Sequence, residues 1–339
     1  MILLRKLLFP FAVLYGLVTS IRNFLYDQGF LKSYSFDVPI IAVGNLSVGG
    51  TGKTPMIEYL IRMLSEQFDV ATLSRGYKRQ SIGFILADEK ADAGTLGDEP
   101  FQIHQKFPDI QVAVDADRKN GIEQLLSQTK KPEVILLDDA FQHRKVKAGF
   151  YILLTAYGDL FCDDWMLPTG NLRESRNGAS RANMIIVTKC PETIDEIARA
   201  EIRKKLKTDQ PVFFTSIAYD DSVYGANSIQ KVNEIKNTQK LLLAGIAKPK
   251  PFFAYLQHEN DIVLTYPDHH HFSENDSNEI KKQAENKLII TTEKDYVRLR
   301  NHIPDTQLYY LPIKTSFVAE GPIFDQTLLN YVGTSTTDR

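Results

Sequence analysis

The chain of 339 residues has few cysteines, little net charge and no long apolar run. Cys162 and Cys190 match neither a disulfide framework nor a metal-site spacing, which favours a reducing cytosol. A formal net charge of −2 lacks the basic excess that is typical of proteins that bind nucleic-acid backbones. Internal repeats and low-complexity segments are absent from the sequence. These absences leave a globular protein as the class that fits. Its length and 43% hydrophobic residues predict about two domains.

Residues 1–30 contain the longest uncharged run, which is short for a membrane span. It covers residues 7–21, between Arg5-Lys6 and Arg22, and is interrupted by Pro10. A transmembrane helix needs about 20 apolar residues. The run has the length of a signal-peptide core, but no cleavage motif follows it.

The same residues predict an amphipathic helix. Its apolar stripe consists of Leu4, Leu7, Phe11, Leu14, Val18, Ile21 and Leu25, and its opposite face of Ala12, Gly16, Thr19 and Asn23. We expect this helix to lie in a membrane interface, with the flanking cations near anionic lipid phosphates. The alternative is a helix that packs on the domain core, because an apolar stripe alone does not separate the two cases.

Residues 39–55, Pro39-Ile-Ile-Ala-Val-Gly-Asn-Leu-Ser-Val-Gly-Gly-Thr-Gly-Lys-Thr-Pro55, predict a strand, a glycine-rich turn and a helix. Such a loop directs backbone N–H groups and a helix N-terminus at phosphate oxygens. Lys53 would reach the β- and γ-phosphates of a nucleotide, and the Thr54 hydroxyl would ligate Mg²⁺. The alternative is a glycine-rich turn that binds nothing. The predicted nucleotide-binding residues are Ser47, Val48, Gly49, Gly50, Thr51, Gly52, Lys53 and Thr54.

Ser47 departs from the general P-loop pattern, which has glycine at that position. Gly49 and Gly50 would supply the flexibility instead, so we expect a phosphate-binding loop with its own geometry.

A second motif, Val134-Ile-Leu-Leu-Asp-Asp-Ala-Phe-Gln-His143, places two carboxylates at the end of an apolar strand. Ligands bind at the carboxyl ends of strands in doubly wound sheets, and a carboxylate beside a P-loop holds Mg²⁺. Asp138 and Asp139 are therefore candidate magnesium ligands. The segment Val187-Thr-Lys-Cys-Pro191 lacks the asparagine and aspartate with which GTPases read guanine, which favours ATP.

Three further segments carry polar candidates. Arg75, Lys78 and Arg79 follow a strand and could grip a phosphorylated substrate or lipid head groups, or form a solvated basic loop. Asp98 precedes a predicted helix and could simply cap it. In Asp268-His-His-His271, one histidine beside an acidic residue is a catalytic candidate, whereas a solvated cluster is the alternative.

Strands and helices alternate in both halves of the chain, which predicts an α/β fold. We expect a P-loop NTPase-like, doubly wound, mostly parallel sheet, a second, smaller α/β domain and an N-terminal membrane-associating helix. The predicted boundaries are 1–30 for the helix, 31–217 for the P-loop domain, 218–237 for a linker and 238–339 for the smaller domain.

The ordered motifs resemble the tetraacyldisaccharide 4′-kinases of lipid A synthesis over nearly the whole chain. The resemblance rests on residues 43–55, Leu73-Ser-Arg-Gly-Tyr77, Gly97-Asp-Glu-Pro100, Leu137-Asp-Asp-Ala-Phe-Gln-His143, Gly170-Asn-Leu-Arg-Glu174, Asp268-His269 and Thr292-Glu-Lys-Asp295. The serine at position 47 is typical of that family. The resemblance implies transfer of the ATP γ-phosphoryl group to the 4′-hydroxyl of a tetraacylated glucosamine disaccharide 1-phosphate, at the cytoplasmic face of the inner membrane, with no obligate protein partner.

The resemblance also implies roles for individual residues. An aspartate and a histidine of the family correspond to Asp98 and His269, which would pair to accept the hydroxyl proton, in either assignment of the base. Arg173 would stabilise charge on the transferred group. Glu174 joins Asp138 and Asp139 as a candidate direct or indirect magnesium ligand.

Two other classes of function are compatible with part of the sequence. A P-loop regulator or metallochaperone-type NTPase that acts on a protein partner would use the loop and the aspartates. It would explain neither the amphipathic helix nor the second domain. A non-enzymatic membrane scaffold would leave the P-loop without a role.

Overall fold

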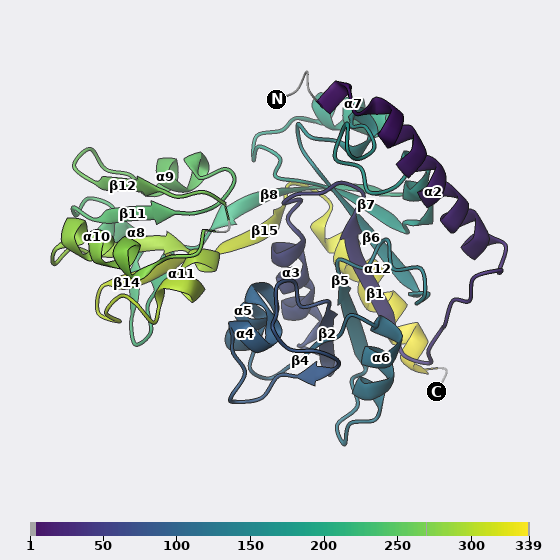
Figure 1. Ribbon diagram of the computed structural model, residues 1–339, viewed down its shortest axis with the longest axis horizontal. Coiled ribbons are helices and arrows are strands. Elements are labelled where there is room, and N and C mark those ends of the chain that lie inside the picture. Colours follow the sequence, from purple (N-terminus) through teal and green to yellow (C-terminus); the bar gives the residue numbers. More distant parts are fainter. Residues whose placement is uncertain (1–4, 269, 338–339) are drawn as a thin grey trace. The chain divides into compact units, whose positions relative to one another are not determined.

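The computed structural model describes residues 5–268 and 270–337, and the chain divides into two compact units. The first unit comprises Met1–Ile217 and Thr315–Arg339, and the second comprises Ala218–Lys314. Each unit combines a sheet with helices, as the alternating pattern predicts (Figure 1).

The described part of the first unit is organised around a nine-stranded sheet in the order β15-β8-β7-β6-β1-β5-β2-β4-β3. The strands are β1 (Ile40–Asn45), β2 (Val70–Ser74), β3 (Ile85–Leu86), β4 (Gln111–Val114), β5 (Val134–Asp138), β6 (Phe150–Ala156), β7 (Met184–Thr188), β8 (Val212–Tyr219) and β15 (Ile313–Phe317). The pairs from β8 through β7, β6, β1, β5 and β2 to β4 are parallel, and β3 is antiparallel to β4. This arrangement confirms the predicted doubly wound, mostly parallel sheet.

The helices of the first unit are α2 (Phe9–Asp27), α3 (Lys53–Leu64), α4 (Ala93–Leu96), α5 (Asp98–Lys106), α6 (Arg118–Leu126), α7 (Glu196–Leu206) and α12 (Gly321–Thr337), with 3₁₀ turns η1 (Phe161–Asp163) and η2 (Arg176–Arg181). Strand β1 lies between β5 and β6, and all six of its residues are buried. Strands that are buried on both faces have continuous apolar sequences, which explains why β1 and β5 could be located from the sequence alone. The central position of β1 places the P-loop at the middle of the carboxyl edge of the sheet.

The second unit is a smaller α/β structure, and its described residues form a six-stranded sheet in the order β10-β9-β14-β13-β11-β12. Its elements are β9 (Ser222–Tyr224), β10 (Ile229–Lys231), α8 (Val232–Ile235), β11 (Leu241–Ala244), α9 (Lys250–Leu256), β12 (Ile262–Thr265), α10 (Glu274–Ala284), β13 (Ile289–Thr292), α11 (Glu293–Leu299) and β14 (Leu308–Leu311). Strands β12, β11, β13 and β14 are parallel, and β9 and β10 extend the sheet antiparallel.

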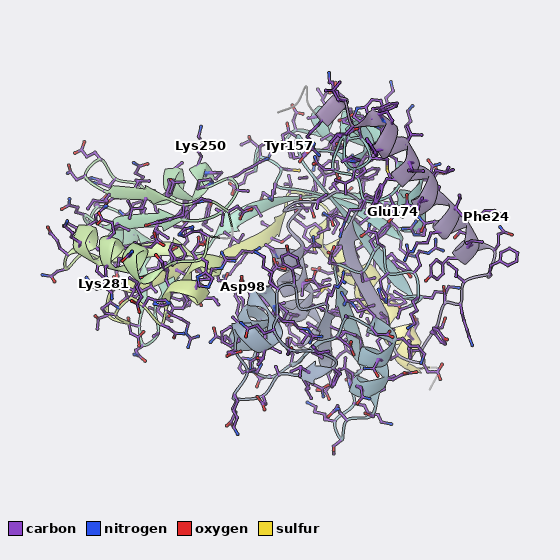
Figure 2. All side chains as sticks on the ribbon, in the orientation of Figure 1. Phe24, Asp98, Tyr157, Glu174, Lys250 and Lys281 are labelled. Carbon is purple, nitrogen blue, oxygen red and sulfur yellow. The ribbon has the colours of Figure 1, made fainter. Side chains whose placement is uncertain are left out.

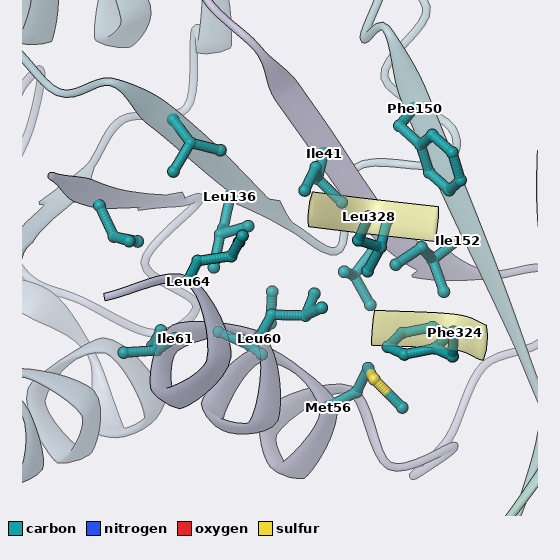
Figure 3. Close-up of a cluster of buried hydrophobic side chains, with 14 of the residues drawn as sticks. Ile41, Met56, Leu60, Ile61, Leu64, Leu136, Phe150, Ile152, Phe324 and Leu328 are labelled. Carbon is teal, nitrogen blue, oxygen red and sulfur yellow. The ribbon is translucent and has the colours of Figure 1, made fainter. Parts of the chain in front are cut away.

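Two of the predicted boundaries differ from the structure. Residues 218–237, expected to be a linker, contain β9, β10 and α8 and belong to the second unit. Residues 315–339, expected in the smaller domain, belong to the first unit. Figure 3 shows the reason: Phe324 and Leu328 of α12 lie against Met56 and Leu60 of α3, inside the hydrophobic core of the first unit. Burial of Phe324 and Leu328 holds α12 in the first unit. The local sequence of residues 315–339 does not show that α3 is the element against which they pack.

Helix α2 contacts the rest of the first unit through its small and polar face. Ala12 is buried, and the Asn23 amide donates to Glu174 (2.8 Å). In the predicted stripe, Phe11, Leu14 and Val18 are 62%, 59% and 57% exposed, and Leu25 is half-buried. Leu4, which was also assigned to the stripe, lies outside the described residues. These three side chains therefore do not pack on the core, although the opposite face of α2 does contact the domain. Within the part of the chain that the structure describes, no helix has the length and hydropathy to cross a membrane.

Candidate active site

The P-loop connects β1 to α3 in the predicted strand-turn-helix arrangement. Gly52 is the N-cap of α3 and has φ +86°, a conformation that favours glycine. Gly44, in β1, approaches the segment after β5 closely, since a Cβ on it would lie 2.7 Å from the Cβ of Phe141. Lys53 and Thr54 are the first two residues of α3, at the helix end whose N–H groups favour anions.

Ser47 occupies its unusual position without strain, since its φ is not positive. Its carbonyl oxygen accepts a hydrogen bond from the Asn45 amide (2.7 Å). The backbone at this position does not need glycine, so the departure from the general pattern has a structural explanation.

Asp138 and Asp139 follow each other at the end of β5 but lie in different environments. Asp138 is buried, and its Oδ1 has no hydrogen-bond partner. Burial, and then the charge of Glu99, raise the pKa of Asp138 to about 7. A buried carboxylate oxygen without a partner is costly unless a cation or donor meets it. This feature fits a magnesium ligand.

Asp139 is held by two cations instead. Both of its oxygens accept hydrogen bonds from the Arg173 guanidinium (2.8 and 3.1 Å), and Lys53 Nζ lies 3.6 Å from Oδ1. Burial alone would raise the pKa of Asp139, but Arg173 and Lys53 outweigh it and lower the pKa to about 2. Asp139 is therefore ionised and neutralised by Arg173 and Lys53, whereas Asp138 retains an oxygen for a metal.

Asn45, the last residue of β1, connects these groups and was not among the predicted site residues. Its Oδ1 accepts hydrogen bonds from Arg173 and from Lys53 (3.4 Å), and its backbone carbonyl accepts from Gln142 (2.8 Å). The signal in the sequence is a single amide at the end of an otherwise apolar strand. A buried amide is expected to have partners, and here they are the two cations of the site.

Arg118 is a second residue that the sequence reading did not select. Its buried guanidinium donates to the carbonyl oxygens of Asp115 and Asp138, both at 2.8 Å. Burial lowers its pKa to about 10, and Asp138 is the largest opposing influence. A cation at the first position of a helix opposes the helix dipole, which could have indicated that Arg118 has a specific partner.

Glu174 has a structural role in this arrangement. Its two carboxylate oxygens accept hydrogen bonds from Asn23 (2.8 Å), Gln142 (2.9 Å) and Arg181 (2.8 and 2.9 Å), and its side chain is almost fully buried. A carboxylate whose oxygens are occupied in this way has little capacity left for a metal. The structure thus does not support Glu174 as a magnesium ligand.

The three cations of the basic segment after β2, Arg75, Lys78 and Arg79, lie in different environments. The Arg79 guanidinium donates to the carbonyl oxygens of Val114 (3.2 Å) and Gly83 (2.7 Å), so it holds the fold together. Arg75 and Lys78 are exposed. Only these two of the three candidate substrate residues remain available to an anionic ligand.

Of the predicted proton-transfer pair Asp98 and His269, Asp98 belongs to the described residues. Asp98 is the first residue of α5, and the N-cap is Gly97, so the capping alternative for Asp98 is wrong. Figure 2 labels Asp98 at that helix. His269 lies outside the described residues. The pairing stays a prediction.

The segment that follows β7 supports the P-loop backbone. The Thr188 hydroxyl donates to the carbonyl oxygen of Thr51 (2.7 Å), and Lys189 Nζ donates to that of Gly50 (2.5 Å). This is the position at which guanine-specific residues are missing. Its side chains contact the loop that would hold the phosphates.

Among residues 5–268 and 270–337, no group of three or more His, Cys, Asp or Glu side chains is arranged as a metal cage. Mg²⁺ commonly takes only one or two protein carboxylates and completes its coordination with phosphate oxygens and water. Asp138 and the buried Thr54 match this limited donor set.

Comparisons with known proteins agree with this site. A family model described as tetraacyldisaccharide-1-P 4′-kinase matches residues 4–333. The chain is 66% identical over 332 residues to a tetraacyldisaccharide 4′-kinase of Flavobacterium johnsoniae, covering 97% of this chain and 98% of that protein. It is 48% identical over 360 residues to one from Bacteroides thetaiotaomicron, covering 98% and 94%. The crystal structure of LpxK from Aquifex aeolicus in complex with ATP superposes with a TM-score of 0.80 at 29% identity, covering 97% and 99% of the two chains.

Proposed function

The chain belongs to the tetraacyldisaccharide-1-P 4′-kinase family and is an ATP-dependent kinase of a lipid A precursor, and we propose a division of roles among its residues. The reaction transfers the γ-phosphoryl group of ATP to the 4′-hydroxyl of a tetraacylated disaccharide 1-phosphate. The observation that carries the assignment of roles is the direct contact of Lys53 and Arg173 with Asp139 beside the P-loop.

Phosphoryl transfer needs positioning and charge neutralisation more than covalent chemistry. N–H groups of the glycine-rich loop and of the first turn of α3 would cradle the phosphates of ATP, and Lys53 would leave Asp139 to contact them. Asp139 would hold the two cations beside the loop before ATP arrives, so that Lys53 only has to exchange its carboxylate partner for phosphate oxygens. Arg173 would then face the charge that spreads over the transferred group.

Magnesium fits the residues present, because Asp138 has a buried oxygen without a partner. Asp138 and the Thr54 hydroxyl would hold the ion, and Asp139 would act indirectly through Arg173 and Lys53. When bound, Mg²⁺ neutralises charge on the phosphates. The raised pKa of Asp138 falls when a cation compensates its charge, so metal binding and ionisation of this carboxyl group are linked.

The acceptor hydroxyl requires a base, for which Asp98 and His269 remain the proposed pair. A carboxylate that is hydrogen-bonded to an imidazole orients the ring and stabilises its protonated form. Asp98 stands at the start of α5, and His269 follows β12. The resemblance of both motifs to the family supports this assignment.

We also propose that α2 holds the enzyme at the membrane in a peripheral or monotopic manner, at the cytoplasmic face where ATP is available. The support is the exposure of Phe11, Leu14 and Val18 on one face of a helix whose other face contacts the protein. An exposed apolar face of this kind inserts into the boundary between head groups and acyl chains. The lipid acceptor lies in the same layer.

The test of the reaction uses labelled ATP, Mg²⁺ and two acceptors, the tetraacylated disaccharide 1-phosphate and the same molecule lacking the 4′-hydroxyl. We expect label to enter only the first acceptor, with a mass gain of one phosphate. A partner-dependent P-loop regulator would instead hydrolyse ATP without labelling either lipid. Omission of Mg²⁺ should abolish transfer.

A further inference from the structure

Helix α2 does more than present an apolar face, because its other face donates hydrogen bonds to the segment that carries Arg173. The Tyr15 hydroxyl donates to the backbone carbonyl of Arg173 (3.0 Å), and the Asn23 amide donates to Glu174 Oε2 (2.8 Å). Figure 2 labels Glu174 between α2 and the sheet, and Phe24 on the outer side of the same helix.

The ends of the helix region reach the same part of the site. The Arg5 guanidinium donates to the carbonyl oxygens of Pro168 (3.2 Å) and Gly170, and Arg22 donates to the carbonyl oxygen of Gln142 (3.1 Å). Side chains from residue 5 to residue 23 thus contact residues 168–174 and their neighbour Gln142. Membrane attachment through the apolar face alone would not require these contacts, which extend from residue 5 to residue 23.

The contacted segment is in turn bonded to the P-loop backbone. Val48 N–H donates to the carbonyl oxygen of Asn171, and Arg173 N–H donates to that of Leu46, both at 2.8 Å. Ser47 and Leu172 form an antiparallel bridge. Residues 170–174 are therefore held on one side by the P-loop and on the other by α2.

Arg173 lies at the centre of this layer. Its backbone carbonyl accepts from Tyr15, its backbone N–H donates to the P-loop, and its guanidinium pairs with Asp139. A displacement of α2 would act on the backbone of Arg173, whose guanidinium contacts both Asp139 and Asn45. Errors of about 1 Å in the position of a catalytic group can lower a rate by roughly 10²-fold.

We propose that Tyr15 and Asn23 are positioning residues for phosphoryl transfer, which hold Arg173 against Asp139 when the apolar face of α2 is engaged by lipid. This inference rests on the proposed function, because it makes membrane engagement act on turnover as well as on location. Helix α2 is then part of the active-site support, and Tyr15 and Asn23 act through Arg173 and Glu174 without touching ATP.

The test separates turnover from binding with Tyr15→Phe, Asn23→Ala and their combination, in vesicles of phosphatidylethanolamine and phosphatidylglycerol that contain the acceptor. We expect kcat of the double variant to fall by about 10- to 100-fold, while KM for ATP and co-sedimentation with vesicles stay within about twofold of wild type. Asn23→Gln, which keeps the amide donor, should recover part of kcat.

Thr19→Ala is the matched control, because within the described residues the Thr19 hydroxyl bonds to carbonyl oxygens of its own helix, those of Tyr15 and Gly16. We expect it to keep wild-type kcat. The inference is overturned if the double variant matches Thr19→Ala in kcat, or if its loss of kcat equals its loss of vesicle binding. Should the double variant unfold, Tyr15→Phe decides alone, since it removes one hydroxyl group. A wild-type protein that labels no acceptor would instead refute the proposed function.

Discussion

Replacement of Phe11, Leu14 and Val18 by serine tests whether the exposed face of α2 is a membrane-binding surface. In the folded protein these side chains are 62%, 59% and 57% exposed, so they contribute little to the core. We therefore expect the triple variant to fold, to bind ATP as the wild type does, and to leave the membrane fraction.

The magnitude follows from the exposed fractions. Full burial of such a side chain contributes ~1.5–3 kcal/mol, so three-fifths of that value leaves roughly 1–2 kcal/mol for each residue at a membrane. The sum of roughly 3–5 kcal/mol corresponds to a loss of roughly 10²–10⁴-fold in the partition coefficient. In the folded protein less than half of each side chain is buried, so its replacement by serine removes little burial. We therefore expect a small change in the unfolding temperature.

The assay is co-sedimentation with vesicles that contain phosphatidylglycerol, together with ATP binding and thermal unfolding of the same preparations. Ile82, Ile197 and Ile323 are 93%, 73% and 60% exposed elsewhere on the first unit, and their triple replacement by serine is the matched control. The control should keep its membrane affinity. An α2 variant that binds vesicles like the wild type, or that unfolds, would refute the reasoning.

Other predictions concern the chemistry of the site. Lys53→Ala should lower kcat/KM by roughly 10²-fold or more with an unchanged unfolding temperature, and near wild-type kinetics would remove the lysine from the mechanism. Asp98→Ala and His269→Ala should each lower kcat by about 10²–10⁴-fold and combine less than additively, whereas additive losses in kinetic assays would exclude a joint role. The pKa of Asp138 is raised from 3.8 to about 7, so its carboxyl group releases a proton on unfolding, and stability without Mg²⁺ should fall as pH rises from about 4 to 7. In EDTA, Asp138→Asn should therefore be more stable than wild type at pH 8 but not at pH 4, by denaturant titration, and inactive. Glu174→Gln should lower the unfolding temperature while leaving the Mg²⁺ dependence of activity unchanged, and a shifted Mg²⁺ dependence would restore this residue as a ligand.

Local patterns in the sequence determined most elements of the fold. The apolar strand that carries Asp138 was predicted where the structure has β5, Val134–Asp138, since a run of apolar residues needs no distant partner to be recognised. The strand-turn-helix context of Lys53 and Thr54, and the two faces of α2, also follow from spacing along the chain. The order of these motifs was sufficient to indicate the family.

Only the tertiary structure decided what each polar group contacts. Asp138 and Asp139 are adjacent in the sequence, yet Arg173, 34 positions away, pairs with the second and leaves the first with a buried free oxygen. Glu174 looked like a metal ligand until Asn23, 151 positions away, and Arg181 were found on its oxygens. Burial and charge pairing depend on distances in space, and these set both the pKa of a carboxyl group and its remaining capacity to bind a metal. The same reason explains why residues 315–337 belong to the first unit, since their apolar side chains pack in the same core as those of residues 41–64.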